Sequence, residues 1–419
     1  FGKTGLKVSA LGFGTMRLPL LEDGVTVDEK EAVRIIRHAI DSGVNYVDTA
    51  YPYHQGTSEI VVGKALGDGY RDKVFLADKS PIWKLEKESD FDSILEEQLQ
   101  KLQTDHIDFY LLHALNKERF EKIKNLHLID HMLEARKAAG MQMGLERMTA
   151  AMELLGRPQE RLRVVHIAGT NGKGSAGAMI RSILTSAGYR VGGYESPAVT
   201  GLRDIITIGG EGIREERFAA LTQRLLALEL RFEELGRLTE FEFTTALAYL
   251  YFAEEKTDLC VVECGLGGRD DATNVIGPPL AAVLTPVALD HTALLGDTIQ
   301  EITTVKCGIC KPPCTVISSP GQTAEALGVI METAAARGLT VRIPNAAAAP
   351  ITEEEPGRLA FVYGGRRYIL RLTGSFQRDN ALTALEVASC LEEKGFSIPD
   401  EAKEAGLAGV VMPCRQEIL

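Results

Sequence analysis

The stretch VVHIAGTNGKGS, residues 164–175, decides the fold of the larger part of this 419-residue chain. It begins as an apolar, β-branched run typical of a buried strand and ends in a Gly-rich turn that opens a helical pattern. Glycines let backbone N–H groups turn toward phosphate oxygens, and the start of a helix adds positive potential. The stretch therefore predicts a phosphate-binding loop between a strand and a helix of an α/β domain, with Lys173 as a mobile cation.

This loop differs from the usual P-loop pattern, because Gly174 stands between Lys173 and Ser175, where that pattern has Ser or Thr directly after Lys. A purely structural turn before a helix is the alternative interpretation. A second Gly-rich stretch, GLGG at 265–268, lacks the third glycine of a dinucleotide fingerprint. We therefore expect one phosphate site, formed by Gly169, Thr170, Asn171, Gly172, Lys173, Gly174 and Ser175.

Strand signals at 163–167, 258–262 and 281–284 alternate with helical patterns around this loop. The alternation predicts a largely parallel sheet covered on both faces, as in a doubly wound α/β domain. Gly364-Gly365 separates two apolar runs, at 358–363 and 366–370, and this spacing predicts a β-hairpin. The alanine-rich run 346–349 stands between two prolines, and we expect a surface loop there.

The N-terminal third has a different sequence pattern, a βα unit that recurs four times. Each unit consists of a short apolar strand, a polar connection and an amphipathic helix. The expected strands are 9–16, 45–49, 74–77 and 107–112, with helices such as 28–42 and 92–102. The pattern changes near Gly140. We therefore expect an α/β protein with a partial (β/α) barrel of about four units over 1–140, followed by a doubly wound ATPase-type domain over 141–419.

Reactive side chains of βα barrels gather where the strands end. Asp48, Lys79 and His113 end predicted strands, and Tyr53 follows one of them, so we expect the four to converge. A neighbouring ammonium lowers the pKa of a phenol. Asp48 would hold Lys79, Tyr53 would protonate an oxygen that hydride transfer makes anionic, and His113 would orient the carbonyl. The alternative for each residue is a buried ion pair or a capped strand end.

GFGTMRLP at 12–19 and DTAYPYHQGTSE at 48–59, together with these four positions, resemble the aldo-keto reductases. The resemblance covers 1–140, the first half of such an enzyme, and implies NADPH-dependent reduction of a carbonyl. The strands that carry most of that family's cofactor contacts have no counterpart here, so we expect no reductase activity. A half barrel also leaves strand edges unpaired.

Oxygen and nitrogen donors that suit Mg²⁺ recur after the phosphate loop, at Ser196, Glu263 and His291. Magnesium prefers oxygen ligands completed by water and by the phosphates of ATP. We therefore expect these residues to serve a magnesium ion. Closely spaced thiols at Cys307, Cys310 and Cys314 raise the alternative of a zinc or iron site, but no fourth ligand stands nearby and we expect buried thiols.

Several ordered segments strongly resemble the folylpolyglutamate synthase and dihydrofolate synthase branch of the Mur ligases, over about 141–419. They are YESPAV at 194–199, EFEFTTA at 240–246, VVECGLGGRDDATN at 261–274, LDHTALLGDTI at 289–299, VKCGICKP at 305–312 and GSFQRDNA at 374–381. The resemblance implies a Mur-ligase-type domain that adds L-glutamate to the carboxylate of a folate or dihydropteroate. ATP would first convert that carboxylate into an acyl phosphate.

The same resemblance assigns roles to single residues. It implies that the loop holds the triphosphate, that Ser196, Glu263 and His291 serve magnesium, and that Lys306 is the lysine such enzymes carbamylate. Gln377 and Asn380 would lie near the adenine, and Arg415 near the phosphates. It also implies a C-terminal ligase domain that would begin about where this chain stops, so we expect one wall of the ATP site to be missing.

Composition excludes two other classes of function. Lys plus Arg number 46 against 58 Asp plus Glu, a net charge of −12, so the basic footprint of a nucleic-acid binder is missing. No apolar run reaches the ~18 residues of a membrane span. Seven cysteines without a disulfide framework indicate reduced thiols in a cytoplasmic protein.

The sequence does not indicate an oligomeric state. A third hypothesis for the function is a non-catalytic fusion of two truncated proteins, because each of the two segments is cut where its fold is incomplete.

Overall fold

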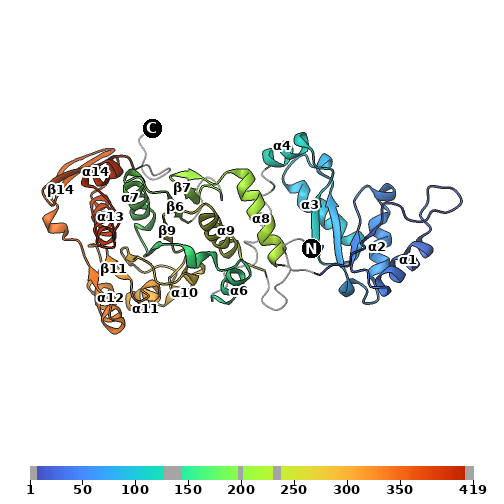
Figure 1. Cartoon of the computed structure of the whole chain (residues 1–419), viewed down its shortest axis with the longest axis horizontal. Helices are drawn as coiled ribbons and strands as arrows, with labels where there is room; N and C mark the ends of the chain where they lie inside the picture. The colour runs from blue at the N-terminus through green and yellow to red at the C-terminus, as the bar shows by residue number, and fades with distance from the viewer. Residues whose placement is uncertain (1–6, 127, 129–143, 197–201, 230–236, 411–419) are drawn as a thin grey trace. The chain divides into compact units, whose positions relative to one another are not determined.

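The structure is a computed structural model that describes residues 7–126, 128, 144–196, 202–229 and 237–410. The chain divides into two compact units, residues Phe1–Ala138 and Ala139–Leu419. They are called the N-terminal unit and the C-terminal unit, and Figure 1 labels the helices of both and some strands of the second.

The N-terminal unit contains four parallel strands in the order β1-β2-β3-β4, with a helix after each of them. Its elements are β1 (Phe13–Gly14), α1 (Glu29–Asp41), β2 (Tyr46–Asp48), α2 (Ser58–Leu66), β3 (Phe75–Ser80), α3 (Ser89–Leu102), β4 (Phe109–Leu112) and α4 (Lys117–Asn125). Strand β3 runs past the predicted end at residue 77, because Lys79 and Ser80 pair with β4 despite their polarity. Lys79 therefore lies within its strand rather than at its end.

The two faces of this four-stranded sheet differ. Val47 and Leu76 are fully buried on the face that α1 and α2 cover. Because side chains alternate along a strand, Tyr46, Phe75 and Phe109 lie on the opposite face. The ring centroid of Phe109 is 5.5 Å from that of Tyr46 and 6.1 Å from that of Phe75. The second face therefore carries a half-buried aromatic cluster.

The C-terminal unit is built on an eight-stranded sheet of order β12-β11-β10-β5-β9-β6-β7-β8. Its strands are β5 (Val164–Ala168), β6 (Val191–Tyr194), β7 (Ile206–Ile208), β8 (Glu211–Gly212), β9 (Leu259–Glu263), β10 (Ala281–Leu284), β11 (Thr315–Ser318) and β12 (Val341–Arg342). Its helices are α6 (Glu146–Leu154), α7 (Lys173–Ser186), α8 (Glu215–Glu229), α9 (Glu240–Glu254), α10 (Thr292–Leu295), α11 (Ile299–Lys306), α12 (Ala324–Arg337), α13 (Phe376–Glu393) and α14 (Asp400–Ala408).

The sheet is mixed, since β7 and β8 run antiparallel at one edge beside six parallel strands. Gly209 and Gly210, both at positive φ, form the short turn between β7 and β8. Such a turn joins only antiparallel strands, whereas parallel strands need a long crossover. This edge was not predicted from the sequence.

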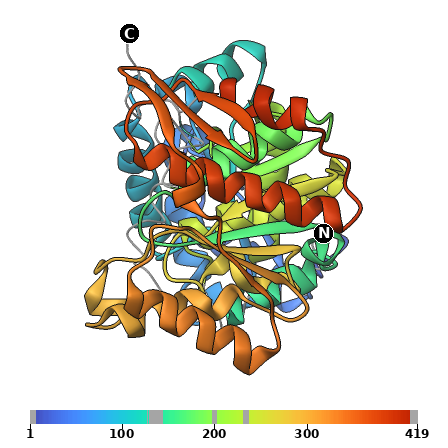
Figure 2. The ribbon, with the colours of Figure 1, turned by 90° about the vertical axis from the view of Figure 1, so that its left-hand side faces the viewer.

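Helices cover both faces of the sheet. Val165 and Ile167 of β5 pack with α7 and α13, while Ala168 and Leu284 pack on the other side with Ile330 of α12. Figure 2 shows the C-terminal helices α13 and α14 in red, and α14 contacts both α7 and the strand β15 (Arg366–Leu370). The sheet is therefore enclosed, and its carboxyl edge is the place where loops can form a site.

The predicted hairpin has the predicted bounds, with β14 (Arg358–Tyr363) and β15 (Arg366–Leu370) joined by two glycines at positive φ. A further strand, β13 (Ile351–Glu355), pairs with β14. The prediction of a surface loop over 346–349 is wrong at Ala349, which is fully buried against the same core as Leu359. The small apolar side chain of an alanine fits into this tightly packed core.

The described residues bear on two expectations from composition, which concern membrane-spanning segments and the state of the cysteines. Of the described helices, none has both the length and the apolar character needed to cross a bilayer. The six cysteines in the described part of the chain are buried and free, and Cys414 lies outside it.

Candidate nucleotide site and reductase-like tetrad

The Gly-rich loop leaves the carboxyl end of β5, the strand between β9 and β10. The chain goes from β5 to β6 and β9 on one side, and then crosses to β10 on the other. This reversal makes the end of β5 a topological switch point, where the loops diverge and ligands of open α/β sheets bind.

Hydrogen bonds hold the loop to the segment that follows β10. The backbone amides of Thr170 and Asn171 donate to the carbonyl oxygen of Pro286, at 3.0 and 3.1 Å. The hydroxyl of Thr170 lies 3.1 Å from the backbone amide nitrogen of Ala288, which donates to it. The loop after β5 and the segment after β10 are therefore held together by hydrogen bonds.

Two loop positions have no room for a side chain. A Cβ atom on Gly169 would lie 1.9 Å from the hydroxyl oxygen of Thr285. A Cβ atom on Gly172 would lie 2.6 Å from Oδ1 of Asn380, and Gly172 also has a φ of +82°. Close approach to β10 and α13 thus requires glycine at both positions, independently of any ligand.

Two lysines flank this loop. The Nζ atom of Lys173 lies 3.4 Å from the carbonyl oxygen of Thr170 and 3.7 Å from a carboxylate oxygen of Glu263. The Nζ atom of Lys306 donates a 2.9 Å hydrogen bond to the carbonyl oxygen of Gly169. Burial, followed by the charge of Lys173, lowers the pKa of Lys306 to about 8. The loop therefore has one half-buried and one buried amine beside it.

Gln377 and Asn380 lie at the start of α13, and both are buried. The Nδ2 atom of Asn380 donates to Oε1 of Gln377 at 3.0 Å, and its Oδ1 atom faces Gly172. The structure thus brings this pair to the phosphate loop. Ser175 is buried in the first turn of α7. Arg415 lies outside the described residues.

The three predicted magnesium ligands are placed differently from one another. Glu263 is buried at the end of β9 and faces Lys173, whereas the side chain of His291 is 53% exposed and lies 3.7 Å from Asp290. Ser196 is half-buried after β6. In the described part of the chain, no three His, Cys, Asp or Glu side chains are grouped to hold a metal. The carboxylate of Glu263 still fits, because magnesium commonly takes one or two carboxylates together with phosphate oxygens.

The CGICKPPC segment forms part of the apolar core. Cys307, Cys310 and Cys314 are buried with Ile309 and Ile330. The prediction of buried thiols is therefore confirmed for these three residues. Burial raises the pKa of Cys314 to about 11, which keeps its thiol protonated at neutral pH.

Sequence reasoning missed the residues that support the loop from β10. The side-chain amide of Gln322 donates to the carbonyl oxygens of Leu284 and Thr285, at 3.1 and 2.9 Å, and accepts from the amide of Val287 at 3.1 Å. A signal was present for Thr285, because it directly follows a predicted strand. None was present for Gln322, which lies in a loop beyond the next strand.

In the N-terminal unit, the four reductase-like residues converge. The Nζ atom of Lys79 lies 2.6 Å from Oδ1 of Asp48 and 5.0 Å from the centre of the Tyr53 ring. The rings of Tyr53 and His113 meet edge to face, with centroids 5.9 Å apart. Burial, followed by the positive charge of Lys79, lowers the pKa of His113. A neutral imidazole and a phenol beside an ammonium are therefore close together.

Behind this tetrad lies a buried polar network that the sequence did not indicate. The side-chain amide of Gln98 donates to carboxylate oxygens of Glu59 and Asp78, at 2.7 and 2.8 Å. Burial and the nearby charge of Glu59 raise the pKa of Asp78 to about 8. Asp78 precedes Lys79, so the network supports the strand that carries the tetrad.

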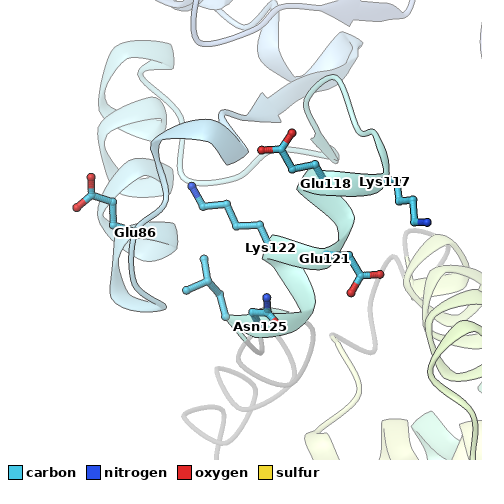
Figure 3. A pocket seen from close by; sticks show the side chains of 7 residues that line it. Glu86, Lys117, Glu118, Glu121, Lys122 and Asn125 are labelled. Atoms are coloured by element: carbon cyan, nitrogen blue, oxygen red, sulfur yellow. The ribbon is translucent and has the colours of Figure 1, made fainter.

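Two surface grooves hold none of the predicted site residues. Figure 3 shows the groove beside α4, lined mostly by charged side chains: Glu86, Lys117, Glu118, Glu121, Lys122, Asn125 and Leu126. The second groove, in the C-terminal unit, includes Arg190, Tyr251 and Glu255 near the amino ends of β6 and β9. The phosphate loop lies at the carboxyl ends of the strands, so this groove is at the opposite edge of the sheet.

The enclosed mixed sheet and the Lys-containing glycine loop at its switch point define a nucleotide-binding α/β domain. The chain is 38% identical over 290 residues to the dihydrofolate synthase/folylpolyglutamate synthase of Bacillus subtilis, an alignment that covers 67% of each chain. The chain therefore belongs to the folylpolyglutamate synthase/dihydrofolate synthase family, a family of ATP-dependent ligases.

Further similarities agree with this family. The dihydrofolate synthetase of Saccharomyces cerevisiae is 39% identical over 209 residues, but the match spans only 48% of that relative. A solved folylpolyglutamate synthase of Thermotoga maritima is 31% identical with a TM-score of 0.62, covering 70% of this chain and 68% of its own. Residues 10–138 instead match the aldo/keto reductase family. Both resemblances expected from the sequence are therefore confirmed.

Proposed function

We propose that residues 139–419 bind ATP and use it to join L-glutamate to the carboxylate of a folate or dihydropteroate. The observation that carries the proposal is the Gly-rich loop, which is hydrogen-bonded to the segment after β10, packs against α13 and has two lysine amines beside it. Similar solved structures include an FPGS–AMPPCP complex and an FPGS–AMPPCP–folate complex, which supports ATP and folate as the ligand classes.

In this proposal the loop amides and Lys173 hold the phosphates of ATP and stabilise the charge that develops during phosphoryl transfer. The substrate carboxylate takes the γ-phosphoryl group, which releases ADP and forms an acyl phosphate. The amine of glutamate then attacks the acyl carbon and expels inorganic phosphate. No residue of the chain is covalently modified in these steps.

Magnesium, when bound, would neutralise charge on the phosphates. Glu263 is the residue best placed to hold it, since its carboxylate is buried beside Lys173. His291 and Ser196 remain proposed ligands from the family resemblance. The same resemblance proposes carbamylation of Lys306, and the lowered pKa of its amine favours this, because only the neutral form of a lysine reacts.

The test is phosphate release by the purified full chain with ATP, magnesium, L-glutamate and either dihydropteroate or tetrahydrofolate. Phosphate release by the parent chain should require dihydropteroate or tetrahydrofolate. The rate of release should fall at least tenfold in Lys173→Ala. Lys394→Ala, at an exposed position after α13, is the matched control and should retain the rate. Release that is equal in both variants would contradict the proposal.

A second candidate function comes from the tetrad, because Asp48, Tyr53, Lys79 and His113 lie close together and a phenol beside an ammonium supports proton transfer to a carbonyl oxygen. NADPH would supply the hydride. A quench of Trp83 fluorescence on addition of NADPH, together with carbonyl reduction that is lost in Tyr53→Phe, would support this activity. A chain that neither binds NADPH nor releases phosphate would leave the non-catalytic fusion as the remaining interpretation.

A further inference from the structure

The sheet of the N-terminal unit has two open edges. Strand β1 pairs only with β2, and β4 pairs only with β3, among the strands that the structure describes. All four strands are parallel, so both open edges run in the same direction. A strand beside either edge could therefore continue the parallel order of this sheet.

Both edges carry exposed apolar side chains. Leu11 and Met16 flank β1 and are 72% and 59% exposed, while Leu111 in β4 and Leu115 just after it are 40% and 49% exposed. Soluble proteins protect edge strands by keeping them very short or with charges, prolines or covering segments, and β1 is short, with two residues. The longer edge strand β4 has no such protection from its own apolar sequence, Phe109–Leu112, and apolar side chains gathered at an edge favour contact with another protein.

The aromatic cluster of Tyr46, Phe75 and Phe109 lies on the sheet face opposite to α1 and α2. In closed parallel barrels the corresponding face is the interior, and side chains from all eight strands fill it. Four strands supply only half of such an interior. A second set of four parallel strands would therefore cover the aromatic face and pair with both the β1 edge and the β4 edge.

We propose that two copies of this chain associate through their N-terminal units, with β4 of each copy beside β1 of the other, to close an eight-stranded parallel barrel. A second copy is the partner that fits, because one twofold axis satisfies both open edges at once and leaves none exposed. The two aromatic clusters then form one interior. Both tetrads lie at one rim, since Lys79 and His113 are near the carboxyl ends of β3 and β4.

Light scattering coupled to size-exclusion chromatography of the full chain tests this arrangement. The chain should be a dimer at micromolar concentration. Leu111→Lys places a charge in β4 on the face that carries Phe109, which is the interior of the proposed barrel, and should give a monomer. Gly14→Lys should do the same from the β1 edge, and the fold should tolerate it because a Cβ atom there meets nothing within 4 Å. Met331→Lys, the same kind of change on exposed α12, should remain dimeric.

Circular dichroism and Trp83 emission identify a variant that fails to fold. If either Leu111→Lys or Gly14→Lys fails to fold, the oligomeric state of the other variant tests the proposal. A monomeric parent chain, or a dimer that persists in both folded edge variants, overturns the proposal. Hydrogen exchange adds a measurement without substitutions. The amides of β4 should exchange several-fold more slowly in the dimer than after dilution to the monomer, and equal rates would count against pairing at this edge.

Discussion

The Nζ atom of Lys306 donates a 2.9 Å hydrogen bond to the carbonyl oxygen of Gly169, which precedes it by 137 residues. This contact links the end of α11 to the first residue of the phosphate loop. Lys306 is 4% exposed, and Lys173 is the charged group that lowers its pKa most. The loop is therefore positioned by a buried amine from a distant helix as well as by its own glycines.

Replacing Lys306 with alanine should impair both stability and ligase activity. The substitution leaves the Gly169 carbonyl without this partner in a buried site, and a loss of about 1–3 kcal/mol in the free energy of unfolding follows. Phosphate release should fall at least tenfold. Urea denaturation followed by circular dichroism and the phosphate assay measure the two effects, with Lys394→Ala as the exposed control. Unchanged values for both would show that the contact has no role.

Gly169→Ala should abolish binding of an ATP analogue. Its methyl group would lie 1.9 Å from the Thr285 hydroxyl oxygen, so the loop must move away from β10. Gly328→Ala is the matched control, because its Cβ meets nothing within 4 Å on exposed α12. That change should leave binding intact and raise stability by up to about 1 kcal/mol. Calorimetric titration with AMPPCP distinguishes the two variants, and equal affinities would disprove the steric argument.

Removing the carboxylate of Asp48 should destabilise the N-terminal unit. Lys79 is only 14% exposed and would keep its bond to the Thr49 carbonyl but lose its counter-charge. We expect Asp48→Ala to cost about 1–3 kcal/mol. Trp83 is the only tryptophan of the chain and lies in this unit, so its emission during urea unfolding reports this unit alone.

The control for this measurement is Asp41→Ala. Asp41 forms a longer, half-exposed ion pair with Lys73, at 3.6 Å, and accepts an exposed hydrogen bond from the Tyr70 hydroxyl, at 2.9 Å. Such surface pairs contribute about 0–1 kcal/mol. A cost for Asp48→Ala no greater than that for Asp41→Ala would mean that the Lys79 contact does not stabilise the fold.

The N-terminal unit should lose stability as the pH rises from about 4 to about 8. Asp78 has its pKa raised from 3.8 to about 8, mainly by burial. The native state therefore keeps a proton that the unfolded chain releases over this range, and unfolding becomes more favourable with rising pH. The charged groups near Asp78 are Glu59, whose negative charge also raises the pKa of Asp78, and Lys79, whose positive charge lowers it. Lys101 pairs with Glu59 at 3.1 Å.

The pH effect is measured by urea unfolding of the full chain at several pH values, with Trp83 as the probe. Asp78→Asn removes the titrating group and should flatten the dependence. Asp72→Asn, in the exposed turn before β3, should retain the parental slope. Parallel slopes for the parent chain and Asp78→Asn would contradict the assignment to Asp78.

Much of the fold follows from local patterns. The alternation of apolar strands and amphipathic helices predicts both sheets, and the Gly364-Gly365 pair predicts a hairpin whose bounds agree with the structure. These features depend on neighbouring residues, so they can be read without tertiary contacts. The antiparallel pairing of β7 with β6 and the burial of Ala349 could not be read in this way, because each depends on residues that are not neighbours in the sequence. The turn between β7 and β8 did leave a local signal, the Gly209-Gly210 pair, although no hairpin was predicted there.

The candidate site shows the same division. The loop from Gly169 to Ser175 and the tetrad could be predicted, because residue type and position at strand ends suggest their chemistry. The support from Gln322 and the network around Gln98 could not, since hydrogen bonds over tens of residues leave no local pattern. Polar residues of this kind look like ordinary surface residues in the sequence.

By itself, the sequence determined that the chain joins a four-unit βα segment to a nucleotide-binding α/β segment, because periodicity and glycine spacing are local properties of a chain. Only the tertiary structure decided that Asn380 faces Gly172, that Lys306 bonds to Gly169, and that Gln322 holds the end of β10. Packing sets these relationships, since burying apolar surface brings distant residues together and fixes their distances.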